Sequence, residues 1–256
     1  MFDGSADIYD RFVGRYGVPL GDAMLDFAGV GAGMRVLDVG CGTGALAGQA
    51  AARVGAANVA GADPSEPFVE SCRRRVPEAD VRVAPAESLP FDDDSFDAVM
   101  AQLAVQFMSD APRGVSEMAR VARPGGVVAA CVWDYADRMR LLRAFWDAAV
   151  AVDPGSAARD EARLLRYAKA DELGALWSEA GLADVATEGL EVEAAYDDFD
   201  DLWLPFLAGV GPAGAYAASL DPDGQAALRE QLRQELGDPS GPFTLTALAW
   251  GVRGNA

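Results

Sequence analysis

A glycine-rich turn follows a short apolar run in residues 36–44 (VLDVGCGTG). Glycines let the backbone approach a ligand closely, and the helix expected after Gly44 presents free N–H groups at its first turn. Asp63 ends the next apolar run, where a carboxylate can accept hydrogen bonds from both hydroxyls of a ribose. The pattern therefore predicts a nucleotide-type site.

The acid at position 38 discriminates between two kinds of nucleotide. Gly40, Gly42 and Ala45 also satisfy the dinucleotide fingerprint, but Asp38 would place a like charge beside a pyrophosphate. Two unit charges ~4 Å apart interact by about 4 kcal/mol at an effective dielectric of about 20. A ligand with no phosphate and with a cationic ammonium fits better. S-adenosylmethionine, which combines adenosine, a sulfonium and an amino-acid tail, is such a ligand.

Composition and charge exclude several functional classes. The chain has 256 residues, enough for a full hydrophobic core, and a formal net charge of -19. Because this charge repels phosphate backbones and anionic lipids, neither nucleic acid nor a membrane is expected as a partner. Histidine is absent, which excludes Ser-His-Asp and Cys-His nucleophiles and histidine-ligated metals. The cysteines have neither zinc nor disulfide spacing, so we expect no metal and a reducing, cytoplasmic setting; they are Cys41, Cys72 and Cys131.

Short apolar runs alternate with amphipathic stretches in the first half of the chain. This alternation predicts an α/β fold whose parallel sheet is covered on both faces. The second half is less regular and is expected to add helical insertions, and residues 123–126 (RPGG) are predicted to form a turn. Strands are predicted at 35–39, 58–62, 81–84, 96–101, 127–133, 183–194 and 243–252, and helices at 20–28, 45–54, 67–76, 112–122, 141–150, 173–180 and 225–236.

An uncharged segment at residues 202–220 is long enough to span a membrane. Glycines and prolines interrupt it, and aspartates rather than basic residues flank it, so we expect a mobile flap over a pocket or buried helices. Because residues 197–220 are apolar and aromatic, we predict that they form a lid that excludes water and shapes a substrate pocket. Trp203 and Phe206 would then line the pocket, with packing in a core as the alternative for each.

Four ordered motifs between Tyr9 and Trp133 resemble those of class I S-adenosylmethionine-dependent methyltransferases, in particular the ubiquinone- and menaquinone-biosynthesis type and its small-molecule relatives. They are VLDVGCGTG, ADPSEPFVE, APAESLPFDDDSFDAVMAQLAVQFMSD and RVARPGGVVAACVWD. The resemblance implies a Rossmann-like, doubly wound, seven-stranded sheet of order 3-2-1-4-5-7-6 with strand 7 antiparallel. It also implies S-adenosylmethionine as cofactor and S-adenosylhomocysteine as product.

The same resemblance assigns roles around the adenosine. Gly40 and Gly42 would back the methionyl and ribose part, with Asp38 close by. Asp63 would bind the ribose hydroxyls, and Pro64 would pack on the adenine face.

Further residues are implied at the adenine edge and at the methionine. Ala86 and Glu87 would border the adenine edge, although Glu87 is also consistent with a simple turn acid. Gln102 would lie beside the methionine moiety. Tyr9 and Arg15 would close over the cofactor, with Arg15 pairing with its carboxylate or remaining a solvated arginine.

The predicted reaction is methyl transfer to a small-molecule, hydrophobic or aromatic acceptor of secondary metabolism. The sulfonium methyl is already activated, so the enzyme chiefly has to place the acceptor in line and exclude water. The sequence identifies no catalytic residue; a base, if the acceptor has to lose a proton, would be Tyr9, Asp134 or Tyr135. Trp133 would line the substrate or favour the cationic sulfonium.

Two alternatives stay open: a cofactor-retaining enzyme or binding module that does not methylate, and a nicotinamide-dependent oxidoreductase. The latter lacks a Tyr-x-x-x-Lys pair, because the only lysine is Lys169. The acceptor and the oligomeric state do not follow from the sequence. We predict one methyltransferase domain over 1–256, with cap helices at 1–30, the cofactor-binding core at 31–135, helical insertions or a lid at 136–170 and 195–240, and the last strand at 243–252.

Overall fold

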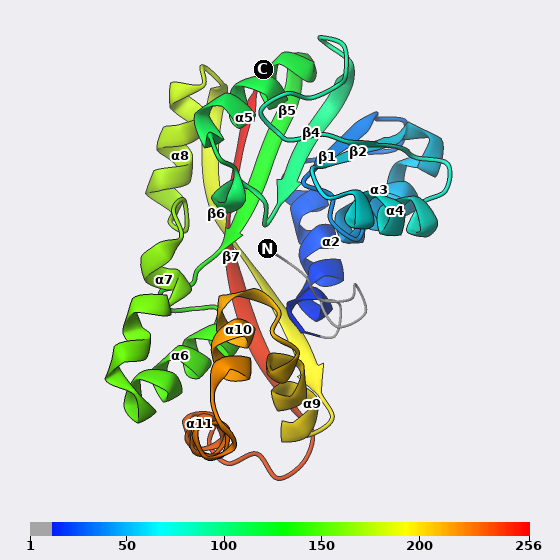
Figure 1. The fold of residues 1–256 in the computed structure, drawn as a ribbon. Helices are drawn as coiled ribbons and strands as arrows, with labels where there is room; N and C mark the ends of the chain where they lie inside the picture. Colours follow the sequence, from blue (N-terminus) through cyan, green and yellow to red (C-terminus); the bar gives the residue numbers. More distant parts are fainter. Residues whose placement is uncertain (1–11) are drawn as a thin grey trace. The chain divides into compact units, whose positions relative to one another are not determined.

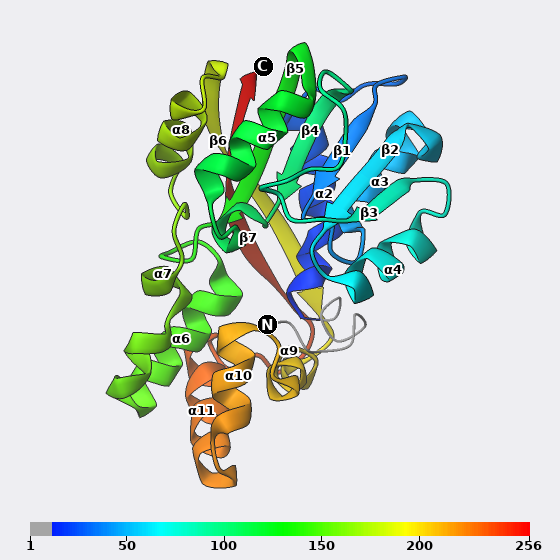
Figure 2. The ribbon, with the colours of Figure 1, turned by 45° about the horizontal axis from the view of Figure 1, so that its top comes forward.

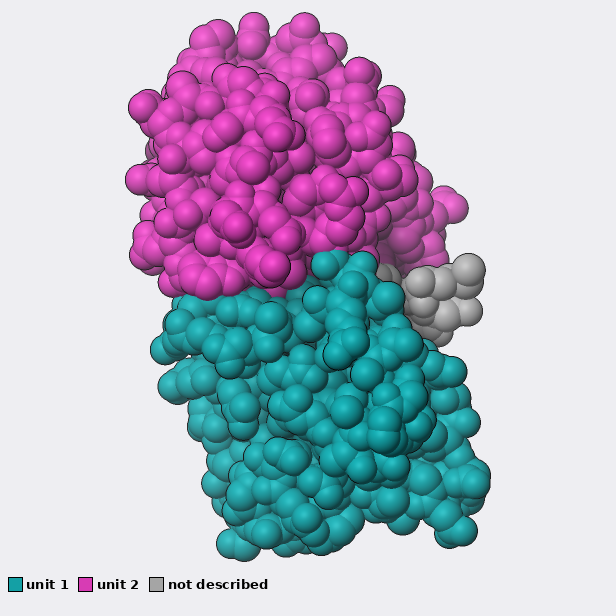
Figure 3. All heavy atoms as spheres, turned by 90° about the vertical axis from the view of Figure 1, so that its left-hand side faces the viewer, with its two compact units in different colours: residues 1–16, 134–165, 191–248 teal, residues 17–133, 166–190, 249–256 magenta. Residues whose placement is uncertain are grey.

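The computed structural model describes residues 12–256 (Figure 1). The chain folds into two compact units, which Figure 3 draws in two colours. Tyr9, one of the predicted cap residues, lies outside the described residues, and the single-domain boundaries stay a prediction. Unit 1 comprises residues 1–16, 134–165 and 191–248, and unit 2 comprises residues 17–133, 166–190 and 249–256.

A seven-stranded sheet has the strand order β3-β2-β1-β4-β5-β7-β6. Strands β3, β2, β1, β4 and β5 are parallel neighbours, and β7 runs antiparallel to β5. This order and these directions confirm the α/β, doubly wound fold expected from the sequence. The strands are β1 (Val36–Val39), β2 (Val59–Asp63), β3 (Asp80–Val83), β4 (Phe96–Gln102), β5 (Ala122–Trp133), β6 (Ala183–Tyr196) and β7 (Phe243–Asn255).

Unit 2 covers its strands with helices. Every residue of β1 and β2 is buried, which explains why these strands consist of continuous apolar runs rather than alternating ones. Helix α2 packs on α3 and α3 on α4, while α5 packs on α8 and lies in front of β4 and β5 in Figure 2. The helices are α2 (Gly17–Phe27), α3 (Ala45–Val54), α4 (Glu66–Arg75), α5 (Ala111–Val121) and α8 (Ala170–Glu179), with the short 3-10 helices η2 (Ala56–Asn58) and η3 (Val105–Phe107).

The turn predicted at residues 123–126 is wrong, because these residues belong to β5. The register between β4 and β5 shifts between Phe96 and Ala98, and such a bulge accommodates extra residues within a strand. Gly125 has a φ of 77° and its N–H donates to the carbonyl of Ala256 at 2.8 Å. The chain end thus supplies the pairing that keeps this segment extended.

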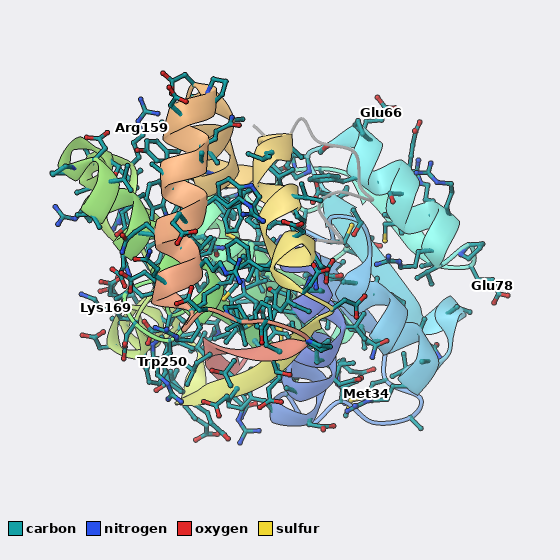
Figure 4. The ribbon with its side chains drawn as sticks, turned by 90° about the horizontal axis from the view of Figure 1, so that it is seen from below. Met34, Glu66, Glu78, Arg159, Lys169 and Trp250 are labelled. Atoms are coloured by element: carbon teal, nitrogen blue, oxygen red, sulfur yellow. The ribbon has the colours of Figure 1, made fainter. Side chains whose placement is uncertain are left out.

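Unit 1 is built around stacked aromatic rings. The ring centres of Phe145 and Phe206 lie 4.4 Å apart with the planes 13° from parallel, and Trp146 and Trp203 flank this pair. Tyr216 meets Trp146 at 5.7 Å, and the guanidinium of Arg159, which is labelled in Figure 4, lies 5.5 Å from the centre of the Tyr216 ring. The helical elements are η1 (Val13–Tyr16), α6 (Arg140–Val152), η4 (Pro154–Arg159), α7 (Glu161–Leu164), α9 (Phe199–Trp203), η5 (Leu204–Ala208), α10 (Gly211–Ser219) and α11 (Pro222–Glu235).

The uncharged segment 202–220 forms helical structure rather than an open loop. It contains the end of α9, all of η5 and α10, and the buried side chains of Trp203 and Phe206. This agrees with the buried-helix interpretation of the segment. Within residues 12–256, no helix combines the length and the apolar character that a membrane crossing requires.

A buried acid joins three elements of unit 1. Glu161 is 4% exposed, and its carboxylate accepts a hydrogen bond from the indole N–H of Trp146 in α6. A backbone hydrogen bond from Ala213 in α10 also reaches it. Burial, only partly offset by these hydrogen bonds, raises the pKa of Glu161 to about 7. The protonated acid is therefore the form that the folded unit favours.

Replacing Glu161 by glutamine is expected to stabilise unit 1 at alkaline pH. Because the folded-state pKa lies above the ordinary value of 4.5, the stability that Glu161 contributes is present below pH 4.5 and is lost as the pH rises through 7. Glu161→Gln keeps an acceptor for Trp146, so it should match the wild type at pH 5 and exceed it at pH 8 by up to about 3 kcal/mol. Urea unfolding at the two pH values measures this difference. The exposed Glu235→Gln is the control, and an equal gain in both variants would contradict the prediction.

Candidate functional site

Asp38 occupies the carboxyl end of β1 and is 1% exposed. Its Oδ2 accepts a hydrogen bond from the N–H of Ala47 in the first turn of α3 at 3.0 Å. Its Oδ1 is buried and has no hydrogen-bond partner. Burial, opposed by the Ala47 bond and reinforced by the negative charge of Asp63, raises the pKa of Asp38 to about 7.

Asp63 ends the neighbouring strand β2 and lies on the other side of the glycine turn. Its Oδ2 accepts from the N–H of Gly42 at 3.0 Å, and its Oδ1 accepts from the N–H of Ser65 at 2.8 Å. Burial raises its pKa in spite of these two bonds. Within residues 12–256, neither Asp38 nor Asp63 has an arginine or lysine partner. The site therefore presents negative charge that no cation of the described chain balances.

The three glycines of the turn have positive φ angles but different surroundings. A Cβ on Gly40 would lie 2.5 Å from the Cβ of Ala104, and one on Gly44 would lie 2.9 Å from the Sγ of Cys72. A Cβ on Gly42, whose φ is 51°, would meet no atom within 4 Å. Gly40 and Gly44 thus permit close packing, whereas Gly42 borders open space beside the two acids. We call Asp38, Gly40, Gly42 and Asp63 the cradle.

Helix α3 begins directly after the turn. Gly44 is its N-cap, and no side chain caps it. Ala47 donates its N–H to Asp38, and the remaining free N–H groups of the first turn add positive potential at this end. The helix end thereby supports the ionised form of Asp38, while burial and Asp63 oppose it.

Gln102 ends β4 and links it to α2. Its side-chain amide donates to the carbonyl of Gly17 at 2.9 Å, while its Oε1 is buried without a partner. A Cβ on Gly21 would lie 3.4 Å from that oxygen, at ordinary van der Waals distance. The Oε1 of Gln102 is thus a second buried acceptor in unit 2 without a hydrogen-bond partner, as expected if a bound ligand supplies the donor.

The predicted adenine-edge residues lie in the loop after β3. The Oε1 of Glu87 accepts from the hydroxyl of Ser109 at 2.8 Å and from the N–H of Asp110 at 3.0 Å. Although burial opposes it, these bonds lower the pKa of Glu87. The carboxylate is therefore committed to the loop before α5. Ala86 is half-buried, and Pro64 is exposed just after Asp63.

Arg15 belongs to unit 1 and already has protein partners there. Its guanidinium donates to Asp201 at 3.0 and 3.2 Å and to the carbonyl of Ala195 at 2.9 Å. It also lies 4.2 Å from the centre of the Tyr196 ring. The phenol of Tyr196 hydrogen-bonds that of Tyr16 at 3.1 Å. The predicted pairing of Arg15 with a cofactor carboxylate stays a prediction.

The other predicted pocket and base residues within residues 12–256 are buried, while Tyr9 lies outside them. Trp203 and Phe206 lie in the aromatic core of unit 1, and Trp133 is the last residue of β5. Asp134 accepts a hydrogen bond from the N–H of Asp137 at 3.2 Å and is 8% exposed, and Tyr135 is 6% exposed. Their roles toward an acceptor stay predictions. Within residues 12–256, no three or more cysteine, aspartate or glutamate side chains are grouped to hold a metal ion.

One residue of the site region was missed. Leu103 follows β4 with a φ of 58°, an uncommon conformation for leucine that is found at functional sites. Its N–H donates to the carbonyl of Cys131 at 2.9 Å, which holds the strand end in place. No feature of the sequence indicates this conformation, because leucine has no preference for it.

The comparisons with known proteins agree with this geometry. A family model for the methyltransferase domain matches residues 37–130. Methyltransferase GfsG of Streptomyces halstedii is 36% identical over 195 residues, which cover 72% of this chain and 67% of that protein. The chain belongs to the class I S-adenosylmethionine-dependent methyltransferases.

Further relatives of this methyltransferase include an enzyme that acts on a named compound. Aklanonic acid methyltransferase DauC of a Streptomyces species is 35% identical over 134 residues, covering 50% of this chain and 61% of that protein. A solved phosphoethanolamine N-methyltransferase of Haemonchus contortus, in complex with S-adenosylhomocysteine, shares the fold with a TM-score of 0.56 at 18% identity, covering 92% of this chain and 52% of that one.

Two alanine substitutions in the turn of this methyltransferase should separate packing from binding. Gly44→Ala forces a Cβ against Cys72 and is expected to destabilise the fold by about 1–3 kcal/mol. Gly42→Ala meets open space, so its stability cost should be limited to about 1–2 kcal/mol for the left-handed backbone. Its methyl group would narrow the cradle, so the affinity for S-adenosylhomocysteine should fall at least tenfold. Urea unfolding and calorimetry measure the two effects; unchanged affinity in Gly42→Ala would remove this glycine from the site.

Proposed function

We propose that this methyltransferase transfers the methyl group of S-adenosylmethionine to a small hydrophobic or aromatic molecule. The observation that carries the cofactor assignment is the pair of buried carboxylates, Asp38 and Asp63, with no basic partner in the described chain. A cationic nucleoside with no phosphate complements such a pair, whereas a pyrophosphate would add further negative charge. This argues against the nicotinamide-dependent oxidoreductase.

Three residues of the cradle, Asp38, Gly42 and Asp63, have hydrogen-bond acceptors or space left for this cofactor. Each carboxylate oxygen of Asp63 accepts one hydrogen bond from a backbone N–H. Each oxygen therefore keeps a lone pair that can accept a hydrogen bond from a ribose hydroxyl. Gly42 leaves room for the ligand, and the exposed Pro64 offers a flat apolar surface to the adenine. The unpartnered Oδ1 of Asp38 and Oε1 of Gln102 offer acceptors to the ammonium. Bound there, S-adenosylmethionine would supply an activated methyl group.

The acceptor assignment is supported by the relatives and by composition. The relative named for aklanonic acid methylation matches half of this chain, and unit 1 is rich in aromatic side chains. Placement of the acceptor in line and exclusion of water would then be the main tasks of the protein. The cofactor-retaining, non-methylating alternative predicts binding of the cofactor without a methylated product. Incubation with labelled S-adenosylmethionine and a library of aromatic metabolites, read by mass spectrometry, separates the two.

Asp63→Ala is expected to lower the affinity for S-adenosylhomocysteine at least tenfold. The lost hydrogen bonds to charged groups are worth about 1.5–3 kcal/mol each. Calorimetry measures the dissociation constant, and NADH serves as the ligand that should not bind the wild type. The matched control is Glu66→Ala, an exposed acid three residues further along the chain, labelled in Figure 4. Equal affinities in Asp63→Ala and the wild type, or binding of NADH alone, would overturn the assignment.

Trp203→Ala tests whether residues 197–220 form a lid over the acceptor. If they do, KM for the acceptor should rise or kcat should fall, while cofactor affinity stays nearly constant. Because Trp203 is 3% exposed, its truncation also costs stability, and Trp203→Phe keeps most of the packing. Leu204→Ala, at an exposed neighbour, is the control. A loss of thermal stability with unchanged kinetics in the two Trp203 variants, and no change in Leu204→Ala, would make the segment ordinary core.

A further inference from the structure

The two acids of the cradle differ in how their carboxyl groups are supported by the surrounding chain. Both are buried, but they are unequally supported by hydrogen bonds. Asp63 accepts from two backbone N–H groups, one on each oxygen. Asp38 accepts from one, and its other oxygen is buried without a partner. When one of two neighbouring carboxyl groups is protonated, the less supported group takes the proton.

Among residues 12–256, no cation lies against Asp38 that would keep it ionised. Strand β2 contributes Asp63, whose negative charge opposes ionisation. Strand β4 contributes Met100 beside Asp38 and, on the same face, the amide of Gln102. The thiols of Cys41 and Cys131 also lie close enough to interact with it electrostatically.

Helix α3 contributes only the N–H of Ala47 and its own dipole to Asp38. The one basic residue of α3 is Arg53 in its last turn, and Arg53 pairs with Asp26 of α2. A partial positive charge therefore faces Asp38, but a full one does not. The charge of the Asp38 carboxylate is compensated only when a cation binds beside it or when the carboxyl group keeps its proton.

We propose that the empty cradle retains a proton on Asp38 and that binding of S-adenosylmethionine releases this proton to solvent. The exchange balances in charge: one O–H bond of the carboxyl group is broken, the proton passes to the buffer, and the cationic ligand compensates the carboxylate that remains. The inference rests on the proposed cofactor function and adds a coupling between cofactor affinity and pH. Burial raises the pKa of Asp38 in the empty site to about 7, so the proton release occurs around this pH.

The sign of the coupling is fixed by this exchange. Below pH 7 the empty site is increasingly protonated, so binding has to displace a proton and the affinity falls as the pH falls. Between pH 8 and pH 6 the dissociation constant should rise about tenfold in the wild type. At pH 7, roughly half a proton per site should be released, and almost none at pH 8.

The test is calorimetry of S-adenosylmethionine binding at pH 6, 7 and 8, in two buffers of different ionisation enthalpy at each pH. Asp38→Asn is the matched variant, because the amide imitates the protonated acid and cannot ionise. It should bind more weakly than the wild type at pH 8, no more tightly than the wild type at pH 6, and release no proton from this position. The amino group of the free ligand titrates identically in both experiments, and the proton release is compared between the two proteins at each pH.

The outcomes separate this inference from the function on which it rests. Binding with the same pH dependence and the same proton release in the wild type and Asp38→Asn overturns the proton exchange and leaves the methyltransferase function intact. Absence of S-adenosylmethionine binding at every pH overturns both. Should Asp38→Asn fail to fold, the wild type alone decides, because proton release that does not diminish from pH 7 to pH 8 contradicts a group that titrates near 7.

Discussion

The hydrogen bond from the N–H of Ala47 to the buried carboxylate of Asp38 is the interaction on which the site depends. It fastens the first turn of α3 to the end of β1, and the glycine turn between them has no other side-chain bond from the strand. On the opposite side, Asp63 holds the N–H of Gly42. The turn is thus clamped between carboxylates that come from adjacent strands. Its backbone is fixed before a ligand arrives, which is what preorganisation requires.

The two buried carboxylates that hold the turn carry an electrostatic cost that the protein without ligand does not remove. Burying an acid with one unsatisfied oxygen is unfavourable, and placing a second acid nearby adds repulsion. Such costs persist at sites where a ligand relieves them. In unit 1 the comparable buried acid is Glu161, and its carboxylate accepts hydrogen bonds from the indole of Trp146 and a backbone amide. The acids of the cradle, by contrast, combine burial with the open space at Gly42.

Much of the fold was predictable because its signals are local. Continuous apolar runs predicted the buried strands, and the glycine turn together with Asp63 predicted which residues form the cradle. The RPGG stretch was misinterpreted because its pairing partner is Ala256, at the far end of the sequence. The bond between Arg15 and Asp201 was equally invisible, since 186 positions separate the two residues. The hydrogen bonds from Ser109 and Asp110 to Glu87 were not predictable either, since they depend on how a loop closes, and the role of Glu87 at an adenine stays a prediction.

The division of the chain into two units limits how the protein can be cut into fragments or recombined with a relative. The backbone passes from one unit to the other at five places, after residues 16, 133, 165, 190 and 248. Two of these passages fall inside β6 and β7, so a cut there would sever a strand rather than a loop. Neither unit can therefore be excised as one continuous stretch. A graft of the aromatic unit from a relative would need five matched junctions, so variation in it is expected to accumulate by substitution rather than by exchange of whole segments.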